Sequence, residues 1–409
     1  MRGLLLAGLV LMADPAAAQS ALGQETDGGV VVNAARSQAG LQAWVLAFRP
    51  RALVAGVPAA VFDASMRDVQ FSDTIVKRDR NQNEFSKTIW DYLDTAVSAD
   101  RVALGIKALA ANRDLLTRIE AEYGVEAEVV VAVWGLESAY GAFRGDTPIL
   151  GALATLAYDG RRAAFFEAQL IAALRIVANG DVTVAGMVGS WAGAMGHTQF
   201  MPSSWWDYAV DFTGDGKRDI WGDDPADALA STANYLARHG WAKGAAWGLE
   251  VRLPGGFDYA QTTERVKKAV EDWRALGVVP AVGGALPDHG MASVLLPGGA
   301  RGAAFLVFNN FKAIEAYNTA DAYVIAIGHL ADRIKGGPAI AATWPRDLRA
   351  LSLDERMDLQ RLLSAAGFDA GGVDGRMGPK TIAAVKAFQI AHGLVPDGYP
   401  SLDILGRLR

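Results

Sequence analysis

The uncharged run of residues 129–136 (VVVAVWGL), which leads directly into Glu137, constrains the fold more than any other stretch of this chain. Such a run is typical of a core helix, and an apolar setting is a costly place for a carboxylate. Burial raises a carboxyl pKa, so a glutamic acid there can hold a proton near neutral pH and give it to a leaving group. The alternative is that Glu137 ends a core helix and turns to solvent before Gly141. Glu137 alone favours this second interpretation, because most charged residues at helix ends are solvated.

A second segment, residues 189–204 (GSWAGAMGHTQFMPSS), shifts the balance toward a functional site. Its small residues allow a backbone or a sugar to approach closely. The amide of Gln199 and the rings of Phe200 and Pro202 suit polar and stacking contacts with such a ligand. The two segments together therefore predict a site that acts on a carbohydrate.

The two segments resemble the lytic murein transglycosylases of the membrane-bound transglycosylase B type. That family carries W-G-x-E-[S/T]-x-[Y/W]-G and G-S-[W/F]-A-G-A-M-G-x-x-Q-F-M-P-S-S, which correspond here to residues 134–141 and 189–204. The resemblance covers roughly residues 36–335. It implies a mainly α protein whose lysozyme-like helical catalytic core has a helical N-terminal part and a small β-containing insertion.

The resemblance also implies a reaction. Glu137 would protonate the glycosidic oxygen between N-acetylmuramic acid and N-acetylglucosamine, and then take the proton of the 6-hydroxyl as a 1,6-anhydro ring closes. The N-acetyl group would assist at the anomeric carbon, and no cofactor would be required. The residues expected to bind the substrate are Ser190, Gln199, Phe200, Met201 and Tyr317.

Two other functions fit some of the same residues. Glycosidases usually employ two carboxyl groups, and a hydrolytic muramidase would need a second one facing Glu137. Asp146 is near in sequence but precedes Pro148 in a turn, and no spacing ties it to Glu137. A wall-binding scaffold without catalysis would have no need of a carboxylate in an apolar setting.

Composition excludes several further classes. The net charge of −6 over 409 residues argues against a nucleic-acid partner. The five histidines show no metal-ligand pairing, so a zinc amidase or peptidase is disfavoured. Ser190 lacks the glycine two positions before it that a nucleophile elbow needs, and neither a Walker loop nor a dinucleotide fingerprint is present.

The N-terminus has the pattern of a secretory signal. A charged start is followed by a short apolar run and by small residues up to Ala18, which predicts a signal peptide over residues 1–18 and export to the periplasm. Residues 19–35 are expected to be a flexible lead-in. Because the chain has no cysteine, a lipidated cysteine is excluded, and no membrane anchor is expected.

A calcium loop is indicated by the acidic turn that begins at Asp211. Oxygen-bearing residues alternate there and a glycine stands sixth, but the twelfth position is Gly222 rather than glutamate. The family closes this loop with an Asp-Pro-x-Asp run, which residues 224–227 match. The expected calcium ligands are Asp211, Thr213, Asp215, the carbonyl of Lys217, and Asp227. A solvated acidic turn without a metal fits the same residues.

The catalytic domain is expected over residues 36–337, and its sequence pattern departs from helical spacing in one region. Residues 248–308 contain short alternating and apolar runs, which predict a few strands around a helix over residues 266–275. Helical spacing returns after residue 309, where the family has a tyrosine, matched by Tyr317, lining its sugar groove. An ordinary core tyrosine fits that position equally well.

The C-terminal part resembles a small three-helix peptidoglycan-binding domain. The stretch from Gly336-Gly337-Pro338 to Trp344-Pro345 is typical of a linker, expected over residues 338–346, and residues 347–409 are expected to be that domain. The supporting signature, V-D-G-x-x-G-P-x-T, begins at Val373, and Pro379 suits the first position of a helix. The resemblance implies peptidoglycan glycan strands as the partner, and other cell-wall enzymes are conceivable partners.

Overall fold

The computed structural model describes residues 36–80 and 87–409. The predicted signal peptide (1–18) and lead-in (19–35) lie outside the described residues. The chain divides into two compact units. Unit 1 holds the described residues up to position 80, Lys107–Arg238 and Tyr317–Thr319, and unit 2 holds the remainder.

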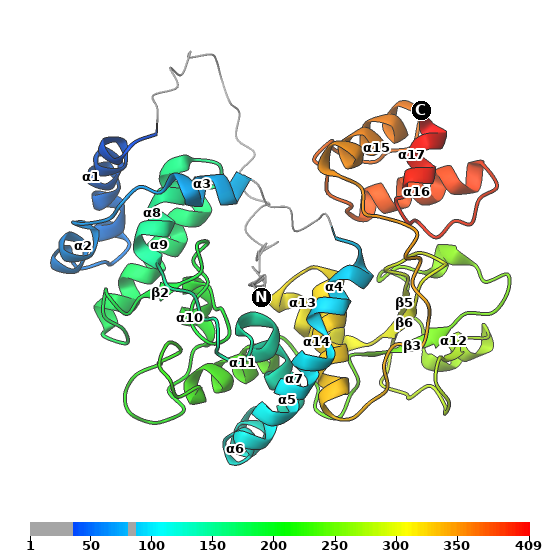
Figure 1. Ribbon diagram of the computed structural model, residues 1–409, viewed down its shortest axis with the longest axis horizontal. Coiled ribbons are helices and arrows are strands. Elements are labelled where there is room, and N and C mark those ends of the chain that lie inside the picture. Colours follow the sequence, from blue (N-terminus) through cyan, green and yellow to red (C-terminus); the bar gives the residue numbers. More distant parts are fainter. Residues whose placement is uncertain (1–35, 81–86) are drawn as a thin grey trace. The chain divides into compact units, whose positions relative to one another are not determined.

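Unit 1 is helical apart from one short antiparallel pair of strands, in which Thr147 faces Gly189 and Pro148 faces Val188. Its elements, all but β1 labelled in Figure 1, are α1 (Gln38–Val54), α2 (Ala59–Met66), α3 (Asp73–Arg80), the end of α5 (Ala99–Ala111), α6 (Arg113–Tyr123), α7 (Ala127–Ser138), β1 (Thr147–Pro148), α8 (Ile149–Asp159), α9 (Ala163–Asn179), β2 (Val188–Gly189), α10 (Pro202–Tyr208) and α11 (Ala226–Arg238).

The helices of unit 1 enclose α7. Every residue of α7 from Val129 to Ser138 is buried, as the uncharged run predicts, and α6 and α11 pack against it. The neighbouring helices end at glycines in the left-handed region, Gly124 after α6 (φ 64°) and Gly180 after α9 (φ 88°). Glycine adopts this conformation at little cost, so each helix can stop at its glycine.

Unit 2 combines a four-stranded antiparallel sheet of order β4-β3-β6-β5 with helices. Its elements before the C-terminal region are α4 (Ile89–Ala96), the start of α5, β3 (Gly248–Arg252), a short 3-10 helix (Tyr259–Gln261), α12 (Val270–Ala275), β4 (Val279–Pro280), β5 (Ser293–Leu295), β6 (Ala304–Val307), α13 (Asn309–Tyr317) and α14 (Asp321–Ile334). The sheet and α12 share one core, which includes Val270, Trp273, Val294 and Leu306.

The three runs expected as strands in residues 248–308 do form β3, β5 and β6, but the helix begins later than the sequence pattern suggests. Lys268 forms a backbone bridge with Ala292, with N–O distances of 3.0 and 2.9 Å. This pairing holds the chain extended, so α12 starts only at Val270. The edge strand β4, which includes Pro280, was not expected. Proline has no N–H to donate, and at the edge of a sheet its N–H side can face away from the neighbouring strand.

The C-terminal region of unit 2 contains three helices, α15 (Leu353–Ala365), α16 (Pro379–Ala391) and α17 (Leu402–Leu408). A capping box between Ser352 and Glu355 starts α15, and Pro379 occupies the first turn of α16 as predicted. Residues such as Leu359, Val385 and Ile404 form a core of their own.

The segment expected as a linker contacts the sheet region. The backbone N–H groups of Ala341 and Ala342 each donate to the Glu250 carboxylate at 2.7 Å. The Trp344 ring lies 6.1 Å from the Trp90 ring, centroid to centroid. These contacts hold the segment against other residues of unit 2.

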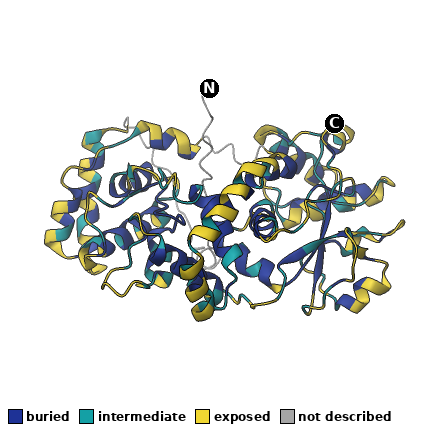
Figure 2. Cartoon of the chain, turned by 60° about the horizontal axis from the view of Figure 1, so that its bottom comes forward, coloured by how far each residue is buried: buried dark blue, intermediate teal, exposed yellow. Residues whose placement is uncertain are grey.

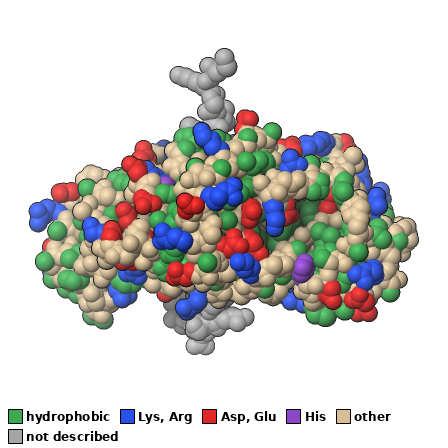
Figure 3. Space-filling model, turned by 90° about the horizontal axis from the view of Figure 1, so that it is seen from below, with side chains coloured by type: hydrophobic (Ala, Val, Ile, Leu, Met, Phe, Trp, Pro, Cys, Tyr) green, Lys and Arg blue, Asp and Glu red, His purple; other side chains and the backbone are tan. Residues whose placement is uncertain are grey.

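The surface pattern is that of a globular protein. The helices carry buried residues on one side and exposed ones on the other (Figure 2). Basic and acidic side chains are interspersed on the face shown in Figure 3. Among the described residues, no helix combines the length and the apolar character needed to cross a bilayer.

Candidate active site

The C-terminal end of α7 presents Glu137. The residue is 3% exposed, so its side chain does not turn out to solvent as the alternative interpretation required. Directly after the helix, Ala139 (φ 50°) and Tyr140 (φ 61°) adopt left-handed conformations that are uncommon without glycine. Strained backbone of this kind is often found at functional sites, where surrounding contacts hold it in place.

Aromatic rings lie around the same part of unit 1. The ring centroids of Phe200, Tyr235 and Tyr317 lie 4.9 to 5.8 Å apart. The Tyr317 hydroxyl donates to the carbonyl of Thr198 at 2.5 Å. Burial raises the pKa of Tyr317 well above its ordinary value, and the nearby negative charge of Glu137 raises it further. Tyr317, an expected substrate contact, is therefore fully buried beside the site.

The segment of residues 189–204 folds into tight turns close to α7. Met195 and Phe200 exchange backbone hydrogen bonds of 2.9 and 3.0 Å. Gly196 (φ 70°) is required here, because a Cβ on it would lie 2.2 Å from the carbonyl oxygen of Ile220. The small residues therefore let this backbone pack against neighbouring backbone.

The expected sugar-binding side chains are held by this folded segment. The Ser190 hydroxyl accepts from the backbone N–H of Ala194 at 3.0 Å. The Gln199 amide nitrogen donates to the carbonyls of Gly196 (2.8 Å) and Arg144 (3.1 Å). Phe200 is fully buried and Met201 is 5% exposed, while Ser190 is partly exposed. The structure thus brings these residues together in one folded segment of unit 1.

The other buried carboxylates among the described residues are Asp79, Asp159, Asp181 and Asp227. Each of them forms ion pairs with arginine side chains, accepts hydrogen bonds from backbone N–H groups, or does both. Asp146, considered as a second acid, is exposed. Glu137 therefore differs from the other buried acids in its aromatic and apolar surroundings.

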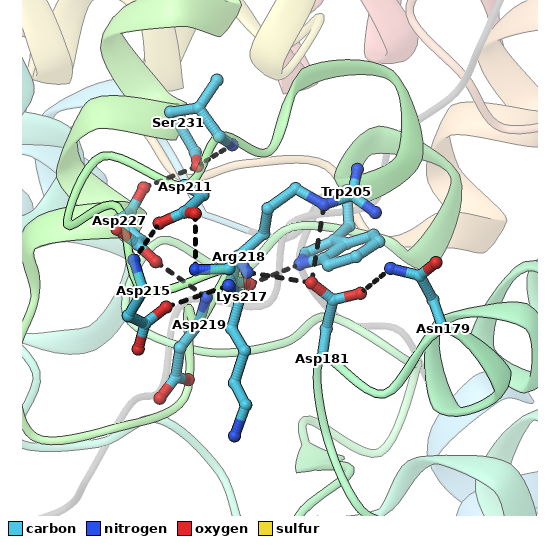
Figure 4. Close-up of polar contacts among 12 residues, drawn as sticks. Asn179, Asp181, Trp205, Asp211, Asp215, Lys217, Arg218, Asp219, Asp227 and Ser231 are labelled. Atoms are coloured by element: carbon cyan, nitrogen blue, oxygen red, sulfur yellow. Dashed lines mark hydrogen bonds and ion pairs between the residues drawn. The ribbon is translucent and has the colours of Figure 1, made fainter.

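The acidic turn gathers three carboxylates. Ligand oxygens of Asp211, Asp215 and Asp227 lie within 4.8 Å of one another, and Figure 4 shows these side chains converging. Calcium prefers carboxylate and carbonyl oxygens in flexible geometry, so this donor set fits that ion. The predicted closing residue, Asp227, is thus brought to the loop although it lies beyond the twelfth position.

Backbone N–H groups fold the loop around its acids. Asp227 accepts from Phe212 (2.9 Å) and Thr213 (3.0 Å) through Oδ1, and from Asp219 (3.0 Å) through Oδ2. Burial raises the pKa of Asp227, and the charge of Asp211 adds to this, while the N–H donors act in the opposite direction. The Thr213 hydroxyl lies 3.3 Å from Asp211, and the N–H of Lys217 donates to Asp215 at 2.9 Å.

Family comparison agrees with this geometry. The model of the transglycosylase SLT domain matches residues 40–332, which is more than half of the chain. The chain belongs to the transglycosylase SLT family. Residues 352–408 match the putative peptidoglycan binding domain. The predicted family resemblance is therefore confirmed.

Individual members of this SLT family give the same result. The membrane-bound lytic murein transglycosylase B of Escherichia coli (strain K12) is 36% identical over 250 residues, which are 59% of this chain. The matched part spans 66% of that relative, slightly less than two thirds of its length.

Solved structures of SLT-family proteins extend the comparison. SltB3 from Pseudomonas aeruginosa, crystallised with NAG-anhNAM-pentapeptide, is 48% identical with a TM-score of 0.87, covering 90% of this chain and 99% of that one. The Escherichia coli lytic transglycosylase Slt35 in complex with calcium is 31% identical with a TM-score of 0.60, covering 72% and 92%. The expected mainly α, lysozyme-like fold with a helical C-terminal domain is thereby confirmed.

One residue of this SLT-family site was not singled out by the sequence. His197 is buried at 3% exposure and contacts Trp134 of the Glu137 helix. In the sequence it stands at a position where the family motif has no fixed residue, and only its place within the site segment could have drawn attention to it.

Proposed function

We propose that this protein is a lytic transglycosylase that cleaves the β-1,4 bond between N-acetylmuramic acid and N-acetylglucosamine in peptidoglycan. The observation that carries the proposal is the burial of Glu137 at the end of α7, within the family motif. The relative SltB3, crystallised with NAG-anhNAM-pentapeptide, supports a product that ends in 1,6-anhydro-N-acetylmuramic acid. This reaction would serve the remodelling and turnover of the cell wall.

Glu137 would act first as an acid and then as a base. Its carboxyl proton passes to the glycosidic oxygen as the bond from that oxygen to the anomeric carbon of the muramic acid breaks. The 6-hydroxyl oxygen of the same sugar then bonds to the anomeric carbon, and its proton returns to the Glu137 carboxylate. No water is consumed, so one carboxylate suffices. The 2-N-acetyl group would stabilise the positive charge at the anomeric carbon between the two steps.

The proposed substrate contacts follow from the hydrogen bonds that Gln199 and Ser190 already form within the protein. The Gln199 nitrogen is held by two carbonyls, so the Gln199 carbonyl oxygen is the atom that would accept from a sugar hydroxyl. Ser190 accepts from a backbone N–H and can donate its own proton to the sugar. Met201 would contact the sugar, whereas the buried rings of Phe200 and Tyr317 would form the wall behind it.

A calcium ion would have a structural role at the acidic turn. Asp211, Asp215 and Asp227 would bind it through carboxylates, with the Thr213 hydroxyl and the Lys217 carbonyl completing the set. A bound cation would offset the repulsion among three gathered carboxylates. The calcium complex of the relative Slt35 supports this assignment. No catalytic step requires the ion.

The remaining residues would place the enzyme on its substrate. The C-terminal region, residues 347–409, would bind peptidoglycan strands, as its family match suggests. Residues 1–18 would direct export to the periplasm and be cleaved near Ala18. Other cell-wall enzymes are the protein partners that such a location would favour.

Mass spectrometry of the soluble muropeptides released from purified peptidoglycan tests the proposed reaction. The wild type should release products that end in 1,6-anhydro-N-acetylmuramic acid, and Glu137→Gln should release almost none. Glu128→Gln, in the first turn of the same helix and at the opposite end from Glu137, is the matched control and should behave as wild type. Reducing-end products would identify a hydrolase, and no release by the wild type would identify a binding scaffold.

A further inference from the structure

His197 joins the Glu137 helix to the loop that follows the acidic turn. Trp134 donates its indole N–H to His197 Nδ1 at 3.1 Å, and the two ring centroids lie 5.7 Å apart. On the other side of the ring, Nε2 lies 2.8 Å from the carbonyl oxygen of Gly222. All three residues belong to unit 1, and the histidine is 3% exposed.

One neutral tautomer of His197 satisfies both of these contacts together. An indole N–H can only donate, so Nδ1 of His197 must accept and carries no proton. The single ring proton is then on Nε2, where it is donated to the carbonyl of Gly222. Protonation of Nδ1 would give a ring with two donors and would break the hydrogen bond from Trp134.

The surroundings keep the ring neutral. Burial lowers the pKa of His197, and the positive charge of Arg144 lowers it further, against opposing effects from Gly222, Asp219 and Asp223. Arg144 Nη1, which can only donate, lies 3.1 Å from Nε2 without a hydrogen bond between them, because both Nη1 and the Nε2–H donate to the carbonyl of Gly222. The geometry of the ring and the charge next to it thus favour the same neutral state.

The contacts of His197 flank Glu137 on both sides. Trp134 is three residues before Glu137 on α7, and Ser138, the next residue, donates its hydroxyl to the backbone carbonyl of His197 at 2.5 Å. The Ser138 hydroxyl in turn accepts the N–H of Gly141 at 2.9 Å. A Cβ on Gly141 would lie 2.6 Å from His197 Nδ1, so the chain passes the ring at a position that only glycine permits.

We propose that His197 is a positioning residue for the transglycosylase reaction: its neutral Nε2-protonated ring and its backbone carbonyl fix the end of α7 and thereby the direction of the Glu137 carboxyl group. This inference rests on the proposed function, in which Glu137 is the acid. Small displacements of a catalytic group reduce the rate of the chemical step while leaving the affinity for a remote glycan largely intact.

Steady-state kinetics on a soluble, defined glycan strand of alternating N-acetylglucosamine and N-acetylmuramic acid tests this proposal. His197→Phe keeps a ring beside Trp134 but removes both ring hydrogen bonds, and kcat should fall about 10-fold to 100-fold with KM within about twofold. His197→Gln can still accept from Trp134 and donate to Gly222, so it should recover most of that loss. His289→Phe, in unit 2 and outside the residues assigned to catalysis or to peptidoglycan binding, is the control and should retain the wild-type kcat.

A double-mutant cycle separates positioning from general damage. Trp134→Phe deletes one of the two ring hydrogen bonds from the other partner, so His197→Phe and Trp134→Phe together should lower kcat little more than His197→Phe alone. If His197→Phe does not fold, Trp134→Phe tests that bond instead. Its kcat is then compared with that of the wild type under conditions in which the two proteins are equally stable to heat.

Two results would overturn the inference. The first is a folded His197→Phe variant with the wild-type kcat. The second is a His197→Gln variant that loses as much kcat and as much thermal stability as His197→Phe. Glu137→Gln distinguishes these failures from failure of the proposed function. If Glu137→Gln is inactive while His197→Phe is normal, only the positioning role is wrong; if Glu137→Gln turns over at the wild-type rate, the proposed function is wrong.

Discussion

Unit 1 contains two kinds of carboxylate site that differ in what surrounds the acid. Glu137 ends a helix that is buried on every side and lies beside aromatic rings. Asp211, Asp215 and Asp227 instead converge within 4.8 Å of one another and accept backbone N–H groups. An apolar enclosure favours an acid that keeps a proton, whereas gathered carboxylates held by N–H donors favour a cation. In the function proposed above, the same functional group would therefore serve proton transfer in one place and metal binding in the other.

The largest effect should come from removing the acid of the first site. Glu137→Gln keeps the shape of the side chain but removes the transferable proton, so the rate of peptidoglycan cleavage should fall by about 10²–10⁴-fold. Because an amide carries no charge to bury, the melting temperature should stay equal to that of wild type or rise. Turbidity clearance and thermal unfolding measure the two properties. A drop in melting temperature that matches the loss of activity would contradict the assignment.

Asp227 tests the second site and should affect stability rather than chemistry. Asp227→Ala leaves three backbone N–H groups without their acceptor, which should lower the free energy of unfolding by about 2–3 kcal/mol. Added calcium should raise the melting temperature of the wild type and not of this variant. Thermal scans with calcium and with a chelator measure both effects. Equal stabilisation of the two proteins by calcium would rule out a role for Asp227 as ligand.

Asp79 sharpens the comparison, because it is as deeply buried as Glu137 but is paired with cations. Burial alone would raise the pKa of Asp79, yet hydrogen bonds and charges from Arg161 and Arg162 bring that pKa below its ordinary value. The folded state therefore binds this proton more weakly than the unfolded state, so the stabilisation is present above the unfolded pKa and is lost as pH falls through the folded pKa.

Arg161→Gln should accordingly lower the free energy of unfolding by about 1–2 kcal/mol at neutral pH, since Arg162 remains to pair with Asp79. The difference from wild type should shrink as the solution is acidified below the ordinary pKa of an aspartate. Urea unfolding at a series of pH values measures this difference. A difference that grows toward low pH would contradict the sign of the Asp79 shift.

The smallest effect is expected at Lys217, whose backbone carbonyl and not its side chain is a candidate ligand. The residue is exposed, so Lys217→Ala should change the free energy of unfolding by less than about 0.5 kcal/mol and leave the response to calcium intact. Calorimetric titration with calcium measures that response. Loss of the calcium effect in this variant would mean that the loop binds through other groups than those proposed.

Local patterns in the sequence predicted much of this architecture. The buried α7, the glycine that ends α9 and Pro379 at the start of α16 follow from rules that act within a few residues. What the sequence did not reveal depends on distant partners. The bridge of Lys268 with Ala292 delays α12, and β4 pairs with a strand far from it in the chain.

The candidate site shows the same limit. Glu137 and the acidic turn stand out as residue types in a pattern, but the contact of His197 with Trp134 joins residues 63 positions apart. The hydroxyl of the fully buried Tyr317 likewise donates to the carbonyl of Thr198, 119 positions away. One sequence carries no record of such pairings, so these parts of the site required the structure.

The most direct test of the central claim is to digest peptidoglycan with the wild type in water enriched in heavy oxygen and to analyse the soluble products by mass spectrometry. If Glu137 takes up the proton of the 6-hydroxyl and no water takes part, the muramic acid ends should be anhydro sugars without heavy oxygen. Heavy oxygen at the reducing ends would mean that water is the nucleophile, and the one-carboxylate mechanism would be wrong.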